Sequence, residues 1–320
     1  MCKNLIFAFF IFISTAIAAQ VVRFREITNF RNNPGNLKLF TLRDSNKTIT
    51  KNKAVVLILH GCSQSAADIY TIADWDKLAK KNDFIVLYPQ QKITNNVSQC
   101  FNWMLEGDVN KSGECLSIYN MMRYAIDSMH IDSSRIFLYG VSAGACMSEV
   151  LCANYPWLIN KAAICAGIPY RAGTGSDAFK LFGKTQVKEA KEWGDLVRKQ
   201  NPAYTGKYPG IILMHGTADF VADYGYTSEL VKQWTNVHQV SEKAKLTDST
   251  YTGNKKVERT VYGDKKNSEA IVYYKIKGMG HKIPVDIGIG EKQGGKDKLF
   301  SEDIDFFSTY YIAKDFGLIK

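Results

Sequence analysis

Apolar strand patterns alternate with helical patterns from residue 54 onward, and this alternation limits the possible folds more than any other feature. The first run, AVVLILH at 54–60, is apolar throughout, which is typical of a strand buried on both faces of a parallel sheet. Further strands are expected at 84–89, 135–140, 161–167, 210–216 and 270–278. Helices are expected at 65–82, 117–130, 143–156, 186–200, 223–237 and 301–316. Repeated strand–helix–strand units predict an α/β fold with a mostly parallel central sheet and helices on both faces.

The first 18 residues have the features of a secretory signal peptide. One Lys precedes an apolar core at 5–13, and Ala16-Ile17-Ala18 fits a cleavage site of the A-x-A type. A retained membrane anchor is the alternative, but the core is shorter than the ~20 residues of a bilayer span. The rest of the chain, 19–320, has no linker, so we predict one domain, with the polar stretch 241–268 as an excursion within it. The leader predicts a secreted or periplasmic protein that is not membrane-bound after cleavage.

Charge and cysteine content exclude several classes of protein. The net charge of +10 is spread along the chain without an Arg-rich stripe, so a nucleic-acid partner is not expected. Six of the seven cysteines follow the leader, and an exported chain is expected to form one to three disulfides from their 15 complete pairings. No cysteine and histidine cluster has the spacing of a zinc site, so no metal is expected. Nothing in the sequence implies a partner protein.

The stretch YGVSAGA contains a G-x-S-x-G motif centred on Ser142. A predicted strand ends at Gly140 and a predicted helix begins by Ala143, which is the strand–turn–helix context of a nucleophile elbow. Such a sharp turn lifts the serine hydroxyl above the sheet, and the helix N-terminus directs backbone N–H groups toward it. The alternative is a serine that only caps the helix. We predict that Ser142 is a nucleophile.

A serine nucleophile needs a histidine base, and the chain has only five histidines. In the order Ser, then Asp or Glu, then His, the base follows Ser142, which excludes His60 and His130. His238 ends an amphipathic helix and is interpreted as a surface residue, and His215 as a structural residue of its loop. His281 lies in the glycine-rich segment KGMGHKIP directly after a strand. We therefore predict that His281 is the base.

The carboxylate that orients the base is expected after a strand between Ser142 and His281. The segment ILMHGTADFVADYG supplies Asp219 and Asp223 after the strand at 210–216. Asp219 lies in the turn itself, whereas Asp223 begins the next predicted helix and has a ready role as its N-cap. We predict Asp219 as the acid, with Asp223 as the alternative.

The chain resembles the polyhydroxybutyrate-depolymerase family of α/β-hydrolase esterases, which includes secreted feruloyl and acetyl-xylan esterases. The resemblance covers about residues 54–317 and rests on seven ordered blocks: LHGCSQSAADI, CFNWM with GECLSI, RIFLYGVSAGACM, AGIPY, HGTADFV, GMGHKIPVD and STYYIAKDFGL. It implies an α/β-hydrolase fold and a Ser142–Asp219–His281 triad. It also implies ester hydrolysis through an acyl-enzyme, without a cofactor.

The resemblance further places Cys62 at the family's oxyanion position, acting through its backbone N–H, with Ala143 as the second donor. A Cys62–Cys100 disulfide would connect the two loops. Trp103 is a candidate wall of the acyl pocket, with a core tryptophan as the alternative. The polar residues of LILHGCSQS are then not expected to include a nucleophile, because Ser63 and Ser65 are expected to shape the turn and start the next helix.

The chain also departs from the family's pattern. It reads PYRAG where depolymerases often have PYGCA, and Gly294 or Gly295 stands where they often have cysteine. No polymer-binding domain follows the closing helix, so soluble oligomers or amorphous polymer are the expected polyester substrates. Short-chain hydroxyalkanoate esters are the favoured substrates. The alternatives are a feruloyl or acetyl-xylan esterase and an inactive hydrolase-fold binding protein.

Overall fold

A computed structural model of the chain describes residues 24–42, 52–175 and 185–320, so the predicted signal peptide at 1–18 lies outside the described residues. None of the helices described is long and apolar enough to cross a membrane. The strands are β1 (Arg25–Glu26), β2 (Lys38–Thr41), β3 (Val55–Leu59), β4 (Ile85–Gln90), β5 (Ile136–Val141), β6 (Lys161–Cys165), β7 (Gly210–Gly216), β8 (Leu246–Asp248), β9 (Val257–Tyr262), β10 (Ile271–Ile276), β11 (Ile283–Val285) and β12 (Ser301–Asp303). The helices are α1 (Ala66–Ala73), α2 (Trp75–Asn82), α3 (Glu106–Val109), α4 (Gly113–Met129), α5 (Ala143–Asn154), α6 (Ala190–Arg198), α7 (Tyr226–His238) and α8 (Ser308–Asp315), with a 3-10 turn at Tyr251–Gly253.

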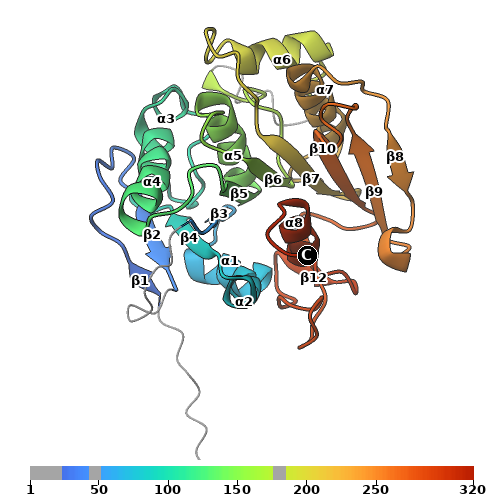
Figure 1. Ribbon diagram of the computed structural model, residues 1–320, viewed down its shortest axis with the longest axis horizontal. Coiled ribbons are helices and arrows are strands. Elements are labelled where there is room, and N and C mark those ends of the chain that lie inside the picture. Colours follow the sequence, from blue (N-terminus) through green and yellow to red (C-terminus); the bar gives the residue numbers. More distant parts are fainter. Residues whose placement is uncertain (1–23, 43–51, 176–184) are drawn as a thin grey trace, which may run out of the picture.

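A ten-stranded sheet runs through the protein in the order β1-β2-β4-β3-β5-β6-β7-β10-β9-β8 (Figure 1). The six central strands, from β4 to β10 in this order, are parallel to one another. The strands at both edges pair antiparallel. The predicted mostly parallel sheet is therefore confirmed. Because the central strands are parallel, their carboxyl ends meet at one edge, where the loops of an α/β sheet form a site.

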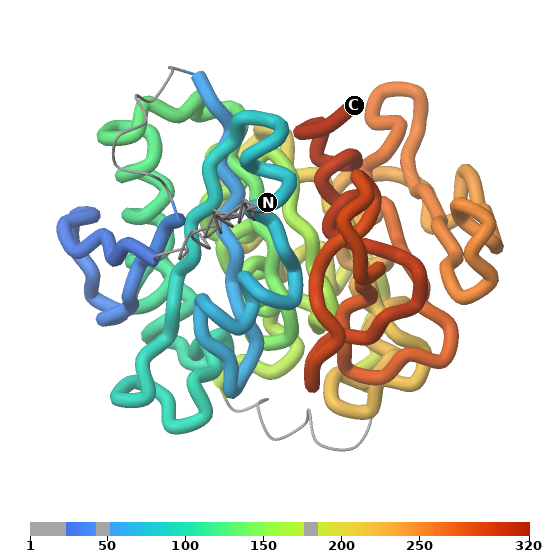
Figure 2. Tube along the Cα trace, turned by 90° about the horizontal axis from the view of Figure 1, so that it is seen from below, coloured from blue at the N-terminus to red at the C-terminus, as the bar shows by residue number. Residues whose placement is uncertain are grey.

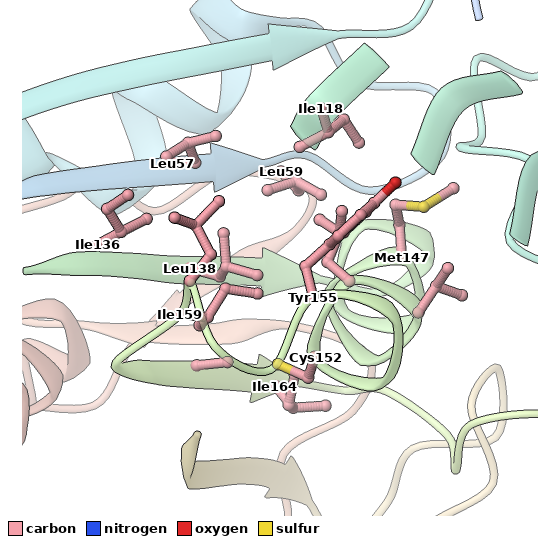
Figure 3. Packing of buried hydrophobic residues seen from close by; sticks show 14 of the residues in the cluster. Leu57, Leu59, Ile118, Ile136, Leu138, Met147, Cys152, Tyr155, Ile159 and Ile164 are labelled. Atoms are coloured by element: carbon pink, nitrogen blue, oxygen red, sulfur yellow. The ribbon is translucent and has the colours of Figure 1, made fainter. Parts of the chain in front are cut away.

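Alternate residues of each central strand pack on opposite faces of the sheet. In β3, Leu57 and Leu59 belong to one buried cluster, and Val56 and Ile58 belong to the other. The first cluster contains apolar residues of α4, α5 and α7, and Figure 3 shows Ile118 and Met147 over Leu57, Leu59 and Leu138. The second contains residues of α1, α2 and α8, which lie in front of the sheet in Figure 2. The predicted helices on both faces are thus confirmed, and their packing excludes water from the strands.

Two sequence expectations about elements need correction, and two pairs of strands were not predicted. The helix expected at 65–82 is broken at Asp74, which adopts left-handed backbone angles (φ 48°, ψ 39°) between α1 and α2. The region expected as one helix at 301–316 begins as β12, and α8 starts only at Ser308. The polar excursion 241–268 contains β8 and β9, and β1 and β2 precede residue 54. These strands are short or polar, and they form by pairing with neighbouring strands of the sheet. The spacing of apolar residues along the chain does not predict such pairing.

The segment between β11 and β12 is held against α2 by two lysines. Lys77 donates from Nζ to the carbonyl oxygen of Gly290 at 2.8 Å and also to the carbonyl oxygen of Gln293. Lys81 forms an ion pair with Glu291 at 2.7 Å. These contacts thus hold the segment that follows His281 in the chain against α2.

Candidate active site

Ser142 lies in the tight turn between β5 and α5, with a positive φ of 55° and a ψ of −121°. The glycines of the motif are required there by close backbone contacts. A Cβ atom on Gly140 would lie 2.3 Å from the carbonyl oxygen of Gly144, and one on Gly144 would lie 2.2 Å from the carbonyl oxygen of Leu59. The serine is therefore held in a strained backbone conformation that presents its side chain at the carboxyl edge of the sheet.

The three predicted triad residues are brought together from separate loops at this edge. His281, in the loop after β10, has Nε2 at 2.9 Å from the Ser142 hydroxyl. Its Nδ1 lies 2.7 Å from Oδ2 of Asp219, in the loop after β7. Ser142 and His281 are partly exposed, whereas Asp219 is buried. A hydroxyl, an imidazole and a buried carboxylate in this order can transfer a proton from the serine and stabilise the imidazolium that forms.

Asp219 is held as a carboxylate by donors on several sides. Its Oδ1 accepts hydrogen bonds from the backbone N–H groups of Val221 (2.9 Å) and Ala222 (3.0 Å). Burial alone would raise the pKa of Asp219, but hydrogen bonds and charge from His215 and His281 outweigh it and hold the pKa well below its usual value. The acid therefore stays ionised wherever the base is active.

His60 fixes the orientation of the peptide between Gly61 and Cys62. The backbone N–H of Gln91 donates to Nε2 of His60 at 3.1 Å, so the proton is on Nδ1, which lies 2.7 Å from the Gly61 carbonyl oxygen. In a trans peptide the C=O and the following N–H point in opposite directions, so this bond turns the Cys62 N–H away from His60. A Cβ atom on Gly61 would lie 3.2 Å from Cβ of Ser142. The loop thus approaches the nucleophile through its backbone.

The Cys62 N–H makes no hydrogen bond to another residue in the described part of the chain. The N–H of Ala143 is the first of α5, and such groups have no acceptor within the helix. Among the described residues, neither of the two N–H groups predicted for the oxyanion hole therefore donates a hydrogen bond to another residue. The side chain of Gln64, buried three residues later, accepts the N–H of Gly61 at 2.7 Å and tightens the same turn.

Cys62 and Cys100 form a disulfide across 38 residues. The same two loops are joined by a hydrogen bond of 2.7 Å from the Ser63 N–H to the Ser98 carbonyl. Four other cysteines are buried free thiols, namely Cys115, Cys146, Cys152 and Cys165. The described residues thus form one disulfide, at the lower end of the predicted number, and it is the pairing that the sequence analysis named as possible. Ser65 caps α1 with Asp68, as expected for the start of the next helix.

Two buried histidines make the stability of the fold depend on pH. Burial lowers the pKa of His60 and of His238 to about 4, whereas an unfolded histidine titrates near ~6.5. As the pH falls through this window, the unfolded chain takes up protons that the folded chain does not. Each histidine is therefore expected to contribute a decrease of about 2 kcal/mol to the free energy of unfolding between about pH 7 and about pH 5, while Glu114 and Glu149, whose pKa values burial raises to about 7 and about 8, contribute in the opposite direction.

Urea unfolding at the two pH values measures this effect. His238→Gln is the matched variant because the chain then retains only one of the two groups. Between the two pH values its free energy of unfolding is expected to change by about 2 kcal/mol less in the destabilising direction than that of the wild type, because the glutamates contribute equally to both proteins. A decrease of the same size in the variant would contradict the assignment to these histidines.

The structure corrects the expectations for two other candidates. Asp223 is exposed, and its Oδ1 accepts the N–H of Gly225 at 2.9 Å, but α7 begins only at Tyr226, so its expected role as the N-cap is wrong. The side chain of His238 is mostly buried rather than exposed at the surface, with Nε2 3.0 Å from the Pro209 carbonyl oxygen. Both side chains have structural partners outside the Ser142–His281–Asp219 arrangement.

Trp103 is half-buried and packs against two apolar clusters. One of these clusters includes Cys146, which follows Ser142 by one turn of α5, and Ala222 of the acid loop packs against the same cluster. The tryptophan therefore lies within the packing that surrounds the predicted site, and its role as a pocket wall stays a prediction.

Sequence reasoning did not find the contacts that hold the site. The bond from Gln91 to His60 forms between neighbouring strands, and the position of His215 beside Asp219 depends on the backbone of the turn after β7. Among the described residues, one group of three carboxylates has the proximity of a metal site, formed by Asp286, Asp303 and Asp305 on the β11–β12 segment. These aspartates already accept protein donors, such as Gln293 and the N–H of Asp305, and they are not part of the triad.

Comparison with known proteins defines the class of protein, first from the fold and then from the sequence. The fold is that of an α/β-hydrolase, because an acetyl xylan esterase from Aspergillus awamori aligns with a TM-score of 0.71 over 81% of this chain and 94% of its own, at 23% identity. The model of the PHB-depolymerase esterase family matches residues 42–247. The poly(3-hydroxyalkanoate) depolymerase C of Paucimonas lemoignei is 36% identical over 99% of this chain and 75% of its own length. A feruloyl esterase B of Talaromyces funiculosus is 30% identical over 82% of this chain and 74% of its own.

The chain therefore belongs to the PHB-depolymerase family of esterases. It is a carboxylic ester hydrolase, as the sequence predicted.

Proposed function

We propose that the protein is a secreted serine esterase that hydrolyses short-chain hydroxyalkanoate esters through Ser142, His281 and Asp219. The observation that supports this most directly is the continuous chain of short contacts, 2.9 Å from Ser142 to His281 and 2.7 Å from His281 to Asp219. The chain also belongs to an esterase family, and a serine, a histidine and an aspartate in contact can hydrolyse an ester together.

In the proposed reaction, His281 takes the hydroxyl proton as Oγ of Ser142 attacks the ester carbonyl. Asp219 keeps the imidazole in the tautomer that presents Nε2 to the serine and stabilises the imidazolium. The imidazolium then protonates the leaving alcohol, and an acyl-enzyme remains on Ser142. Water, activated by the same histidine, releases the acid and restores the serine.

The oxyanion of each tetrahedral intermediate is proposed to accept the N–H groups of Cys62 and Ala143. One such donor typically lowers the barrier by ~3–4 kcal/mol. The His60–Gly61 hydrogen bond and the Cys62–Cys100 disulfide support this role, because they fix the peptide that contains the Cys62 N–H. The side chain of Cys62 has no part in the chemistry.

Cys62→Ser is expected to lower the free energy of unfolding by about 3–4 kcal/mol, because it opens a loop of 38 residues. Esterase activity should survive in part, since the N–H of residue 62 is retained. Cys100→Ser is the matched control, because it breaks the same disulfide without changing the oxyanion loop. The two variants should have similar kcat/KM values. A loss of activity far greater for Cys62→Ser, or inactivation of the native protein by iodoacetamide, would indicate a thiol nucleophile instead.

A hydroxyalkanoate ester is the favoured substrate because the match to the Paucimonas depolymerase, at 36% identity, extends over nearly the whole chain. The alternative is a feruloyl or acetyl-xylan esterase, which the 30% identity to the Talaromyces feruloyl esterase supports. Trp103 is proposed to contact the acyl group, because it packs against the cluster that contains Cys146.

A substrate panel tests this assignment. Hydroxybutyrate oligomers, amorphous polyhydroxybutyrate, methyl ferulate and acetylated xylan are compared by kcat/KM, with Ser142→Ala as the control. The oligomers or the amorphous polymer are expected to be preferred. A preference for methyl ferulate or acetylated xylan would replace the proposed substrate class by the alternative.

An inactive hydrolase-fold protein that only binds ligands is the remaining alternative. A fluorophosphonate probe separates it from an enzyme, because the probe reacts only with an activated serine. We expect one adduct on Ser142 of the folded protein, and its absence would remove the proposed mechanism. The disulfide supports an oxidising compartment such as the periplasm or the medium.

A further inference from the structure

His215 is a second histidine in contact with the acid of the triad. It lies near the end of β7 and is 2% exposed. Its Nε2 is 2.8 Å from the carbonyl oxygen of Ala222 and 3.2 Å from Oδ2 of Asp219. A backbone carbonyl only accepts hydrogen bonds, so Nε2 must bear a hydrogen. The positive end of this N–H therefore lies beside the Asp219 carboxylate.

Ala222 connects His215 to Asp219 by a second route. Its N–H donates to Oδ1 of Asp219 at 3.0 Å, and its C=O accepts the Nε2–H of His215. The other side of Oδ2 faces Nδ1 of His281 at 2.7 Å. The same carboxylate oxygen thus lies between two imidazoles, one of which reaches the nucleophile and one of which does not.

The other ionisable groups around this pair are already engaged with partners. The ring of Tyr224 packs edge-on against His215, with ring centroids 6.0 Å apart, and its hydroxyl is bonded to Tyr273. Lys275 of β10, aligned with His215, lies 3.7 Å from Glu258 of β9. The remaining charged neighbours form two pairs, Glu229 with Lys232 on α7, and Lys282 with Glu302 beside His281.

We propose that His215 is a positioning residue that fixes the Asp219 carboxylate and limits how strongly it raises the basicity of His281. The inference rests on the proposed function, because it assigns Asp219 and His281 to the triad. A donor beside Oδ2 withdraws negative charge from the side that faces His281. Without that donor the carboxylate would be less well oriented and would stabilise the His281 imidazolium more strongly.

Three variants test the proposal. His215→Phe keeps a planar ring but removes the donor, and His215→Gln restores an N–H at a similar distance from the backbone. His238→Phe is the matched control, because His238 is also buried and has Nε2 3.0 Å from a backbone carbonyl oxygen, but it does not contact Asp219. Thermal unfolding confirms that each variant is folded.

The primary measurement is the titration of the His281 imidazole by NMR, which requires no substrate and involves only five histidines in the chain. In His215→Phe the His281 titration and the acidic limb of the kcat/KM profile should both move to higher pH. We expect kcat to fall about tenfold with little change in KM. His215→Gln and His238→Phe should retain the wild-type titration.

An unchanged His281 pKa in folded His215→Phe would overturn the proposal, as would a shift of equal size in His215→Gln. If His215→Phe does not fold, two other variants test the proposal. His215→Gln should then show the wild-type titration of His281. His215→Asn, whose shorter side chain moves the N–H donor away from the carboxylate, should show a shift of that titration to higher pH. Equal titrations in these two variants would overturn the proposal. Failure of the proposed function is recognised separately, by the absence of fluorophosphonate labelling and ester hydrolysis in the wild-type protein.

Discussion

Ser142→Ala is expected to reduce kcat/KM toward a short-chain ester by about 10⁴–10⁶-fold, because Ser142 supplies the only hydroxyl that is hydrogen-bonded to the His281 Nε2 among the described residues. The residual rate would come from the oxyanion donors and from substrate binding. The substitution keeps the backbone of the elbow, and alanine accommodates the same positive φ no worse than serine. Spectrophotometric assay of p-nitrophenyl butyrate hydrolysis measures the loss, and thermal unfolding monitors the fold.

Ser148→Ala is the matched control on the same helix. The Ser148 hydroxyl is buried and donates to the Gly144 carbonyl at 2.9 Å, so its loss tests a structural serine in α5. Its activity should remain within a few-fold of the wild-type value. Activity above about one per cent in Ser142→Ala, or equal losses in the two variants, would show that Ser142 is not the nucleophile.

Asp219→Asn should lower kcat by about 10⁴-fold. The amide is neutral, so it cannot stabilise the imidazolium, and its NH₂ group facing Nδ1 of His281 would favour the wrong tautomer. Asp223→Asn serves as the comparison, because both aspartates lie in the same loop. Asp223 is exposed, and its Oδ1 accepts hydrogen bonds from the N–H of Gly225 and the hydroxyl of Thr185, neither of which belongs to the proposed triad, so its replacement should cost less than tenfold.

Steady-state kinetics on the two variants decide between the acids. Conservative substitution keeps the volume of each side chain, so differences in kcat report charge and tautomer rather than packing. A larger loss in Asp223→Asn would reassign the acid and would also remove the basis for the role of His215.

The main architecture was predictable from the sequence because its central strands are long and apolar on both faces. β3, β5 and β7 were located within one or two residues from such runs alone. The break at Asp74 was not predictable, because the helical pattern continues through it and the left-handed residue contacts Gly295, 221 positions away. The edge strands β8 and β9 are polar and form only through antiparallel pairing.

The triad was predicted by elimination, because the chain has few histidines and each candidate acid lies close to a strand end. The contacts that hold these residues in place could not be predicted by elimination. His60 and Gln91 are 31 residues apart and meet because β3 and β4 are neighbours in the sheet. The proximity of His215 to Asp219 depends on the turn after β7, which only the folded backbone defines.

The close packing of Gly144 against Leu59 has a consequence for how specificity can diversify in this family. Because only hydrogen fits between them, the elbow of Ser142 and the loop of Cys62 cannot shift independently. The proposed nucleophile and oxyanion donors would thus behave as one rigid block that is indifferent to the identity of the acyl group. Changes of substrate are then expected to arise in the neighbouring loops, where Val97 and Phe220 are exposed on segments after β4 and β7. Exchanging such segments between relatives is expected to transfer substrate preference while leaving the chemical step intact.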